Sequence, residues 1–73
     1  MELLERVADD LAKEVLELSE SANDPDLVDA IKKIVGTSST TLEEAYLTAV
    51  RVRRAEKRAR EHLTAYRSKL ESG

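Results

Sequence analysis

The sequence contains no cysteine, phenylalanine or tryptophan, and it has only one histidine, one proline and two glycines. Without cysteine, neither a disulfide framework nor a thiolate metal site can form. Aromatic residues bury the most surface per side chain, so a core whose only aromatics are two tyrosines gains little area per residue. A chain of 73 residues is also near the size at which a single core barely offsets the entropy of ordering the backbone. We therefore expect stability to come from long, regular helix contacts, from association between chains, or from both.

The residues and loops that catalytic sites usually require are scarce or absent as well. A metal site needs several converging ligands, and His62 is the only histidine. The serines fall at expected helix ends or in loops without a glycine-rich elbow, and no glycine-rich phosphate-binding loop is present. We predict no enzymatic activity, no cofactor, no metal and no small-molecule substrate. His62 reads as a surface or boundary residue, with a pH-sensitive interface contact as the functional alternative.

Long apolar runs are absent as well. No stretch approaches the roughly 20 residues that a membrane span needs, and Glu2, Glu5 and Asp9 interrupt any apolar run near the N-terminus. We expect a soluble, intracellular protein that makes no contact with a membrane and carries no targeting segment.

What is present favours helices. Ala, Glu, Lys, Leu and Arg supply 41 of the 73 residues, a bias typical of long helices and coiled coils. A first helix is predicted over residues 2–22, and its apolar side chains widen into a stripe that one partner helix would not cover, so we expect at least two neighbours. The central line of this stripe alternates spacings of four and three: Leu4, Ala8, Leu11, Val15, Leu18 and Ala22.

A second, short helix is predicted over residues 25–35. Asn23 suits the left-handed residue that ends the first helix, Asp24 can cap the next one, and Pro25 suits its first position. Gly36 is expected to stop it. The side chains predicted to be buried are Leu27, Val28, Ala30, Ile31, Ile34 and Val35.

A third helix is predicted over residues 42–70. A polar loop over residues 37–41 leads into it, with a capping box formed by Thr40 and Glu43 or by the next such pair along the chain. At about 1.5 Å per residue this helix is roughly 43 Å long, against roughly 30 Å for the first. In a three-helix bundle it would therefore overhang its partners by several turns.

The apolar face of this third helix changes direction along its length. Its first half presents Leu42, Ala45, Tyr46, Ala49 and Val50. The second half carries what we call the apolar stripe: Val52, Ala55, Ala59, Leu63, Tyr66 and Leu70. Around the helix axis, the stripe is rotated by about a quarter turn or more from the apolar face of the first half. Only part of this rotation is the drift of a heptad pattern on a straight helix. We interpret the rest as two partners, the other two helices for the first half and another copy of the chain for the stripe.

Glu56 falls on the line of the stripe, between Val52 and Ala59. A buried glutamate is costly unless it is paired. Three readings are open: Glu56 faces solvent at the edge, pairs with an arginine of a neighbour, or lines a polar centre of an oligomer. We include it in the predicted oligomer interface with the six residues of the stripe.

Charge is divided unevenly along the chain. Residues 1–30 hold ten acidic and two basic side chains, whereas residues 31–73 hold ten basic and five acidic ones. A basic patch is concentrated at Arg51, Arg53, Arg54, Lys57, Arg58 and Arg60. Such a patch can bind phosphates, but no aromatic residue is interleaved for base stacking and the apolar stripe runs through it. We favour charge pairing with the acidic first helix, and keep binding of nucleic acid or of an acidic protein as alternatives.

Residues 11–34 resemble the helix–loop–helix unit of de novo designed helical repeat proteins. The resemblance is carried by the connector Asn23-Asp24-Pro25-Asp26-Leu27-Val28. It implies a protein made to fold and assemble, with no evolved substrate, and cytoplasmic on expression. No second copy of the unit follows, so we expect an all-α helical bundle completed by self-association, most simply a two-fold dimer with paired third helices. The alternatives are a monomeric designed scaffold or protein binder, and a nucleic-acid accessory protein that uses residues 51–60.

Overall fold

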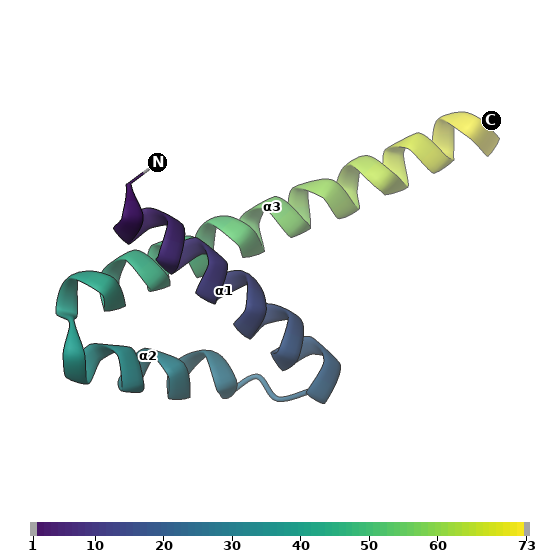
Figure 1. The fold of residues 1–73 in the computed structure, drawn as a ribbon. Coiled ribbons are helices and arrows are strands. Elements are labelled where there is room, and N and C mark those ends of the chain that lie inside the picture. Colours follow the sequence, from purple (N-terminus) through teal and green to yellow (C-terminus); the bar gives the residue numbers. More distant parts are fainter. Residues whose placement is uncertain (1, 73) are drawn as a thin grey trace.

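The computed structural model describes residues 2–72, and within them the chain forms three α-helices and no strand. Helix α1 spans Leu3–Ala22, α2 spans Leu27–Ser38 and α3 spans Thr40–Ser72. The predicted all-α fold with three helices is thus confirmed. In Figure 1, α1 crosses the first half of α3, and α2 runs below this crossing from the end of α1 back to the start of α3. The second half of α3 extends alone towards the C-terminus.

The end of α1 follows the prediction. Asn23 adopts the left-handed conformation, with φ 52°. Its N–H donates to the Glu20 carbonyl at 3.2 Å, and the Asp24 N–H donates to the Ser19 carbonyl at 2.9 Å. These two bonds form a Schellman motif, which satisfies carbonyl groups that the helix end would otherwise leave unpaired.

The start of α2 differs by two residues from the predicted start at Pro25. The Asp24 carboxylate accepts a hydrogen bond from the Asp26 N–H at 3.1 Å, which forms an Asx turn before the helix, but the N-cap of α2 is Asp26 and not the predicted Asp24. The Leu27 N–H, however, bonds to the Asp24 carbonyl only three residues back, at 3.3 Å. Residues 24–26 therefore form a tight turn, and the four-residue spacing of an α-helix begins with the bond from the Ala30 N–H to the Asp26 carbonyl.

The predicted stop at Gly36 and the predicted loop over residues 37–41 are wrong. Helix α2 continues through Gly36, whose φ is not positive, and Ser39 alone separates α2 from α3. Ser39 is extended, with φ −156° and ψ 109°, and its Oγ accepts a hydrogen bond from the Leu42 N–H at 3.0 Å. Ser39 is therefore the N-cap of α3, in place of the predicted capping boxes. The Glu43 carboxylate lies against Gly36 across this tight corner, where a Cβ would require the glutamate side chain to move.

The core lies where α1 crosses α2 and the first half of α3. Tyr46 is fully buried, and its hydroxyl donates to the Val28 carbonyl at 2.8 Å, as a buried tyrosine hydroxyl requires. Of the residues predicted to be buried on α2, Ala30 and Ile34 are instead exposed. The fully buried side chains are Ala8, Ala12, Val15, Val28, Tyr46 and Val50.

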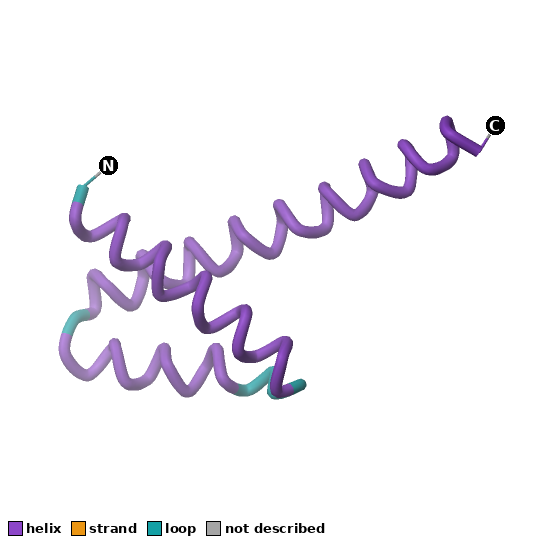
Figure 2. Tube along the Cα trace, turned by 45° about the vertical axis from the view of Figure 1, so that its right-hand side comes forward, coloured by secondary structure: helices purple, strands orange, loops and turns teal. Residues whose placement is uncertain are grey.

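We call residues 54–72 of α3 the overhang, because every one of these side chains is exposed. Figure 2 shows the same projecting helix after a turn of the molecule. The radius of gyration is 15.1 Å, against about 11 Å for a compact domain of this length. The length mismatch predicted from the sequence is therefore present in the fold, and no other segment of residues 2–72 covers the end of α3.

Candidate interaction surface

The apolar stripe is exposed along its whole length. The exposed fractions are 61% for Val52, 56% for Leu63, 58% for Tyr66 and 67% for Leu70. At 100° per residue, the stripe is centred roughly 140° around α3 from the buried Tyr46 and Val50, and heptad drift accounts for only about 40° of this. The stripe therefore faces away from α1 and α2, so its own chain cannot cover it.

The basic patch is partly neutralised by α1. The Arg53 guanidinium donates two hydrogen bonds to the Asp9 carboxylate, from Nε to Oδ1 and from Nη2 to Oδ2, both at 2.7 Å. These bonds lower the pKa of Asp9 and raise the pKa of Arg53. Lys57 Nζ lies 3.0 Å from Glu20 Oε2, and this hydrogen bond raises the pKa of Lys57. The charge pairing that we favoured over nucleic-acid binding is thus present at two of the six basic residues.

The other four basic residues are exposed. Arg60 pairs within α3 with Glu56, at 2.9 Å, so Glu56 faces solvent in the single chain and is paired one turn along the helix. Arg51, Arg54 and Arg58 make no ion pair with any side chain of residues 2–72. These three fall on one side of α3 at 100° per residue, next to the apolar stripe.

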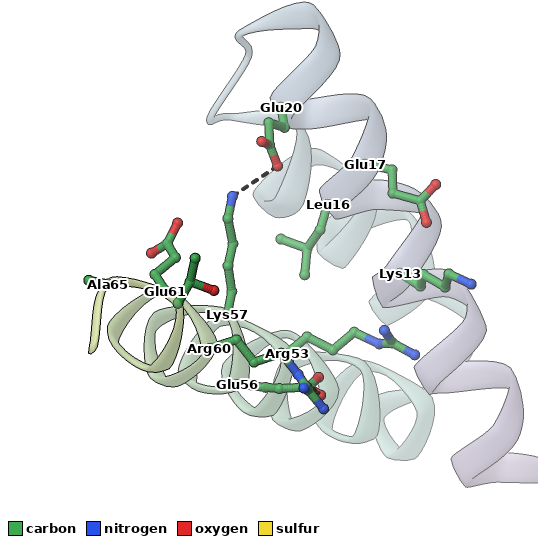
Figure 3. A pocket seen from close by; sticks show the side chains of 11 residues that line it. Lys13, Leu16, Glu17, Glu20, Arg53, Glu56, Lys57, Arg60, Glu61 and Ala65 are labelled. Carbon is green, nitrogen blue, oxygen red and sulfur yellow. Dashed lines mark hydrogen bonds and ion pairs between the residues drawn. The ribbon is translucent and has the colours of Figure 1, made fainter. Parts of the chain in front are cut away.

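A groove of about 650 Å³ opens where α1 and α3 diverge. Figure 3 shows Lys57 reaching across it to Glu20, with Leu16 pointing into the space. Opposite charges line both walls, and Thr64 is the one hydroxyl among the lining residues. This arrangement pairs charges across the gap, and among the lining residues no nucleophile lies beside a base. The apolar stripe, centred roughly 140° around α3 from the core, faces away from this groove.

Sequence analysis missed a second exposed apolar surface, on α1. Leu3, Val7 and Leu18 are 68%, 40% and 53% exposed, although we had assigned Leu18 to the central line of the core-facing stripe. Asp10, Glu14 and Glu17 are also exposed; on the helical wheel Asp10 and Glu17 lie to one side of these residues, and Glu14 lies between Leu3 and Val7. We call these six residues the α1 face. The signal was the width of the apolar stripe on α1, which exceeds what the crossing α3 and the 12-residue α2 cover.

His62 is exposed on the overhang. Within residues 2–72, no group of three histidine, aspartate or glutamate side chains is placed to hold a metal ion. Over the same residues, no helix is both long and apolar enough to cross a membrane.

No known protein-family model matches the chain, and no curated protein and no solved structure is significantly similar to it.

Proposed function

We propose that this chain is a structural, self-assembling helical protein that associates with copies of itself through the second half of α3. The function is that expected of the designed helical proteins which its α1–α2 connector resembles. The observation that carries the proposal is the apolar stripe, which lies exposed along the second half of α3 and faces away from α1 and α2. Apolar patches of this kind are typical of interaction sites.

The spacing of the stripe supports a helical partner. Val52, Glu56, Ala59, Leu63, Tyr66 and Leu70 are separated by four, three, four, three and four residues. This is the heptad spacing with which one helix inserts side chains between those of another. The alanines leave room for a neighbouring backbone to approach closely.

The energetics also favour association. Full burial of a large apolar side chain contributes about 1.5–3 kcal/mol, so the four large residues of two stripes contribute at most roughly 12–24 kcal/mol per pair of chains. The lost freedom of two associating chains costs about 4–15 kcal/mol. Burial of the stripes is therefore large enough to drive association.

The test is the substitution Leu63→Glu, followed by light scattering on a sizing column over a dilution series. We expect the unchanged protein to run as a multiple of 8.2 kDa and the variant to run as a monomer with the helix content of the packed half retained. Ser68→Glu is the matched control, because it adds the same charge on the opposite side of the overhang. A Leu63→Glu variant that keeps the original mass, or an unchanged protein that is monomeric at every concentration, would contradict the proposal.

One observation favours a second candidate. Arg51, Arg54 and Arg58 share a side of α3 and make no ion pair within residues 2–72, as a phosphate-binding surface would require. Binding of the protein to DNA or RNA that weakens steeply as the salt concentration rises would support nucleic-acid binding. A protein that is not retained on DNA or RNA even at low salt would exclude it.

A further inference from the structure

We infer that the overhang docks on the α1 face of a second copy of this chain, and not on the overhang of that copy. The inference rests on the proposed self-association and names the surface that the apolar stripe meets. Four observations carry it: the charge of the overhang, the charge of the α1 face, the direction of the stripe and the matching lengths of the two helices.

Two overhangs repel each other. Residues 54–72 hold six basic and three acidic side chains, a net charge of +3. In the heptad pattern, the edges of the stripe are occupied by Arg60, Arg67, His62 and Lys69, with no acidic residue among them. Either orientation of a paired overhang therefore brings basic edges together, and like charges at these positions select against pairing.

The α1 face has the opposite charge. Helix α1 holds six acidic and two basic side chains, a net charge of −4. Asp10, Glu14 and Glu17 are exposed and make no ion pair within residues 2–72. They lie beside and among exposed apolar side chains, so the α1 face offers a mixed apolar and acidic surface to a helix that has an apolar stripe with basic edges. Charge complementarity of this kind sets partner and register.

Geometry requires the α1 face to belong to another chain. The apolar stripe points away from α1 of its own chain, as the rotation along α3 shows. The 19 residues of the overhang span about 28 Å and the 20 residues of α1 about 30 Å, so the two helices can lie alongside each other for their full lengths. Because this contact joins two different surfaces, it is heterologous, and its repetition from chain to chain gives a closed ring or an open filament. Paired overhangs, by contrast, would leave Leu3, Val7 and Leu18 exposed.

A charge exchange between the two surfaces tests the inference. One variant carries Glu14→Lys with Glu17→Lys, and the other carries Arg67→Glu with Lys69→Glu, at the two edges of the stripe. All four positions are exposed and none makes an ion pair within residues 2–72, so each variant keeps its fold. Asp10 is left unchanged because its charge acts on Arg53 at the Asp9 pair. Solution mass and helix content are measured for each variant alone and for their equimolar mixture.

We expect each variant alone to dissociate, with a dissociation constant raised about tenfold or more at low salt, because like charges then face each other at both contacts. The mixture should recover the original mass, since both contacts between unlike chains again join opposite charges. High salt should shrink the difference between each variant and the unchanged protein.

The inference is overturned if the Glu14→Lys, Glu17→Lys variant keeps the original mass, or if the Arg67→Glu, Lys69→Glu variant alone associates as well as or better than the unchanged chain. The second result is what paired overhangs predict, because it removes their repulsion. If Leu63→Glu dissociates the assembly while the Glu14→Lys, Glu17→Lys variant does not, only the inference fails. If the unchanged protein is monomeric, the proposed function fails with it.

Discussion

The two halves of α3 belong to one uninterrupted helix, yet they have different surroundings. In the first half Tyr46 is fully buried between α1 and α2, whereas in the overhang Tyr66 is 58% exposed. Both tyrosines lie on apolar faces with helical spacing, so their local patterns do not distinguish them. The difference arises because α1 and α2 contain 20 and 12 residues, while α3 contains 33. Burial of an apolar face therefore depends on whether another element is long enough to reach it.

The two halves are also held in a helix by different interactions. The first half is stabilised by tertiary packing, the main source of helix stability in proteins. Apart from the exposed Lys57–Glu20 pair near its start, the overhang has local support, such as the Glu56–Arg60 pair at spacing i,i+4, which contributes about 0.2–0.5 kcal/mol. We expect the overhang to be the least stable part of α3 until a partner covers it.

We expect the largest difference between the two halves of α3 when each tyrosine is replaced in turn. Tyr46→Ala should lower the free energy of unfolding by about 3–5 kcal/mol, because it leaves a large cavity and removes the hydrogen bond to the Val28 carbonyl. Tyr66→Ala should change it by less than about 0.5 kcal/mol in the monomer. Chemical denaturation, at concentrations low enough to keep the chain monomeric, measures both values.

Equal losses from the two substitutions would show that the overhang folds back onto the rest of the chain in solution. Tyr46→Phe is the conservative control, because it keeps the ring and removes only the hydroxyl. We expect it to cost about 0.5–1.5 kcal/mol. A larger loss would mean that the hydrogen bond to Val28, more than the packing of the ring, positions α2.

A second pair of substitutions adds volume instead of removing it. Ala12 is fully buried where α1 meets the core, and Ala59 is exposed on the apolar stripe. Ala12→Leu should destabilise the monomer by about 1–3 kcal/mol, since added methyl groups have no room there. Ala59→Leu should leave monomer stability within about 0.5 kcal/mol of the unchanged protein. A similar tolerance at both positions, measured by the same denaturation, would mean that α1 and α3 are not closely packed.

The helices could be predicted from the sequence more fully than the junctions between them. The helices follow from apolar spacing, and the left-handed end of α1 follows from Asn23, because few residues suit that conformation. The cap of α3 could not be chosen, since residues 37–41 are five consecutive hydroxyl residues and each could have capped the helix. The stop at Gly36 was predicted wrongly because a glycine can also continue a helix, and here its φ is not positive.

The features of the candidate interaction surface were likewise predicted only in part. The exposed apolar stripe followed from helix length and from the change of direction along α3. The charge pairing was expected in kind, but the pair of Lys57 with Glu20 was not, because it depends on the angle at which α1 crosses α3. Exposure of Leu3, Val7 and Leu18 could not be deduced either, since a wide apolar stripe on α1 does not reveal how much of it two neighbours cover.

The smallest expected effect concerns the boundary between the two halves, at the Arg53–Asp9 pair. Because hydrogen bonds from Arg53 lower the pKa of Asp9 in the folded chain, the pair contributes stability at pH values above the unfolded pKa of about 4. That contribution is lost as the pH falls through the lower folded pKa. The difference in unfolding free energy between the unchanged protein and Asp9→Asn should therefore be constant above about pH 5 and shrink towards pH 2. Denaturation at low salt over this range measures it.

Glu71→Gln is the matched control, because it removes an exposed carboxylate of the overhang that forms no ion pair within residues 2–72. Its difference from the unchanged protein should not vary with pH in the same way. Arg53 is the last half-buried residue of α3, so its pairing with Asp9 fixes where the packed half ends and the overhang begins. If the Asp9→Asn difference does not vary with pH, that pair is not formed in solution. The exposed length of α3 would then begin closer to Val50.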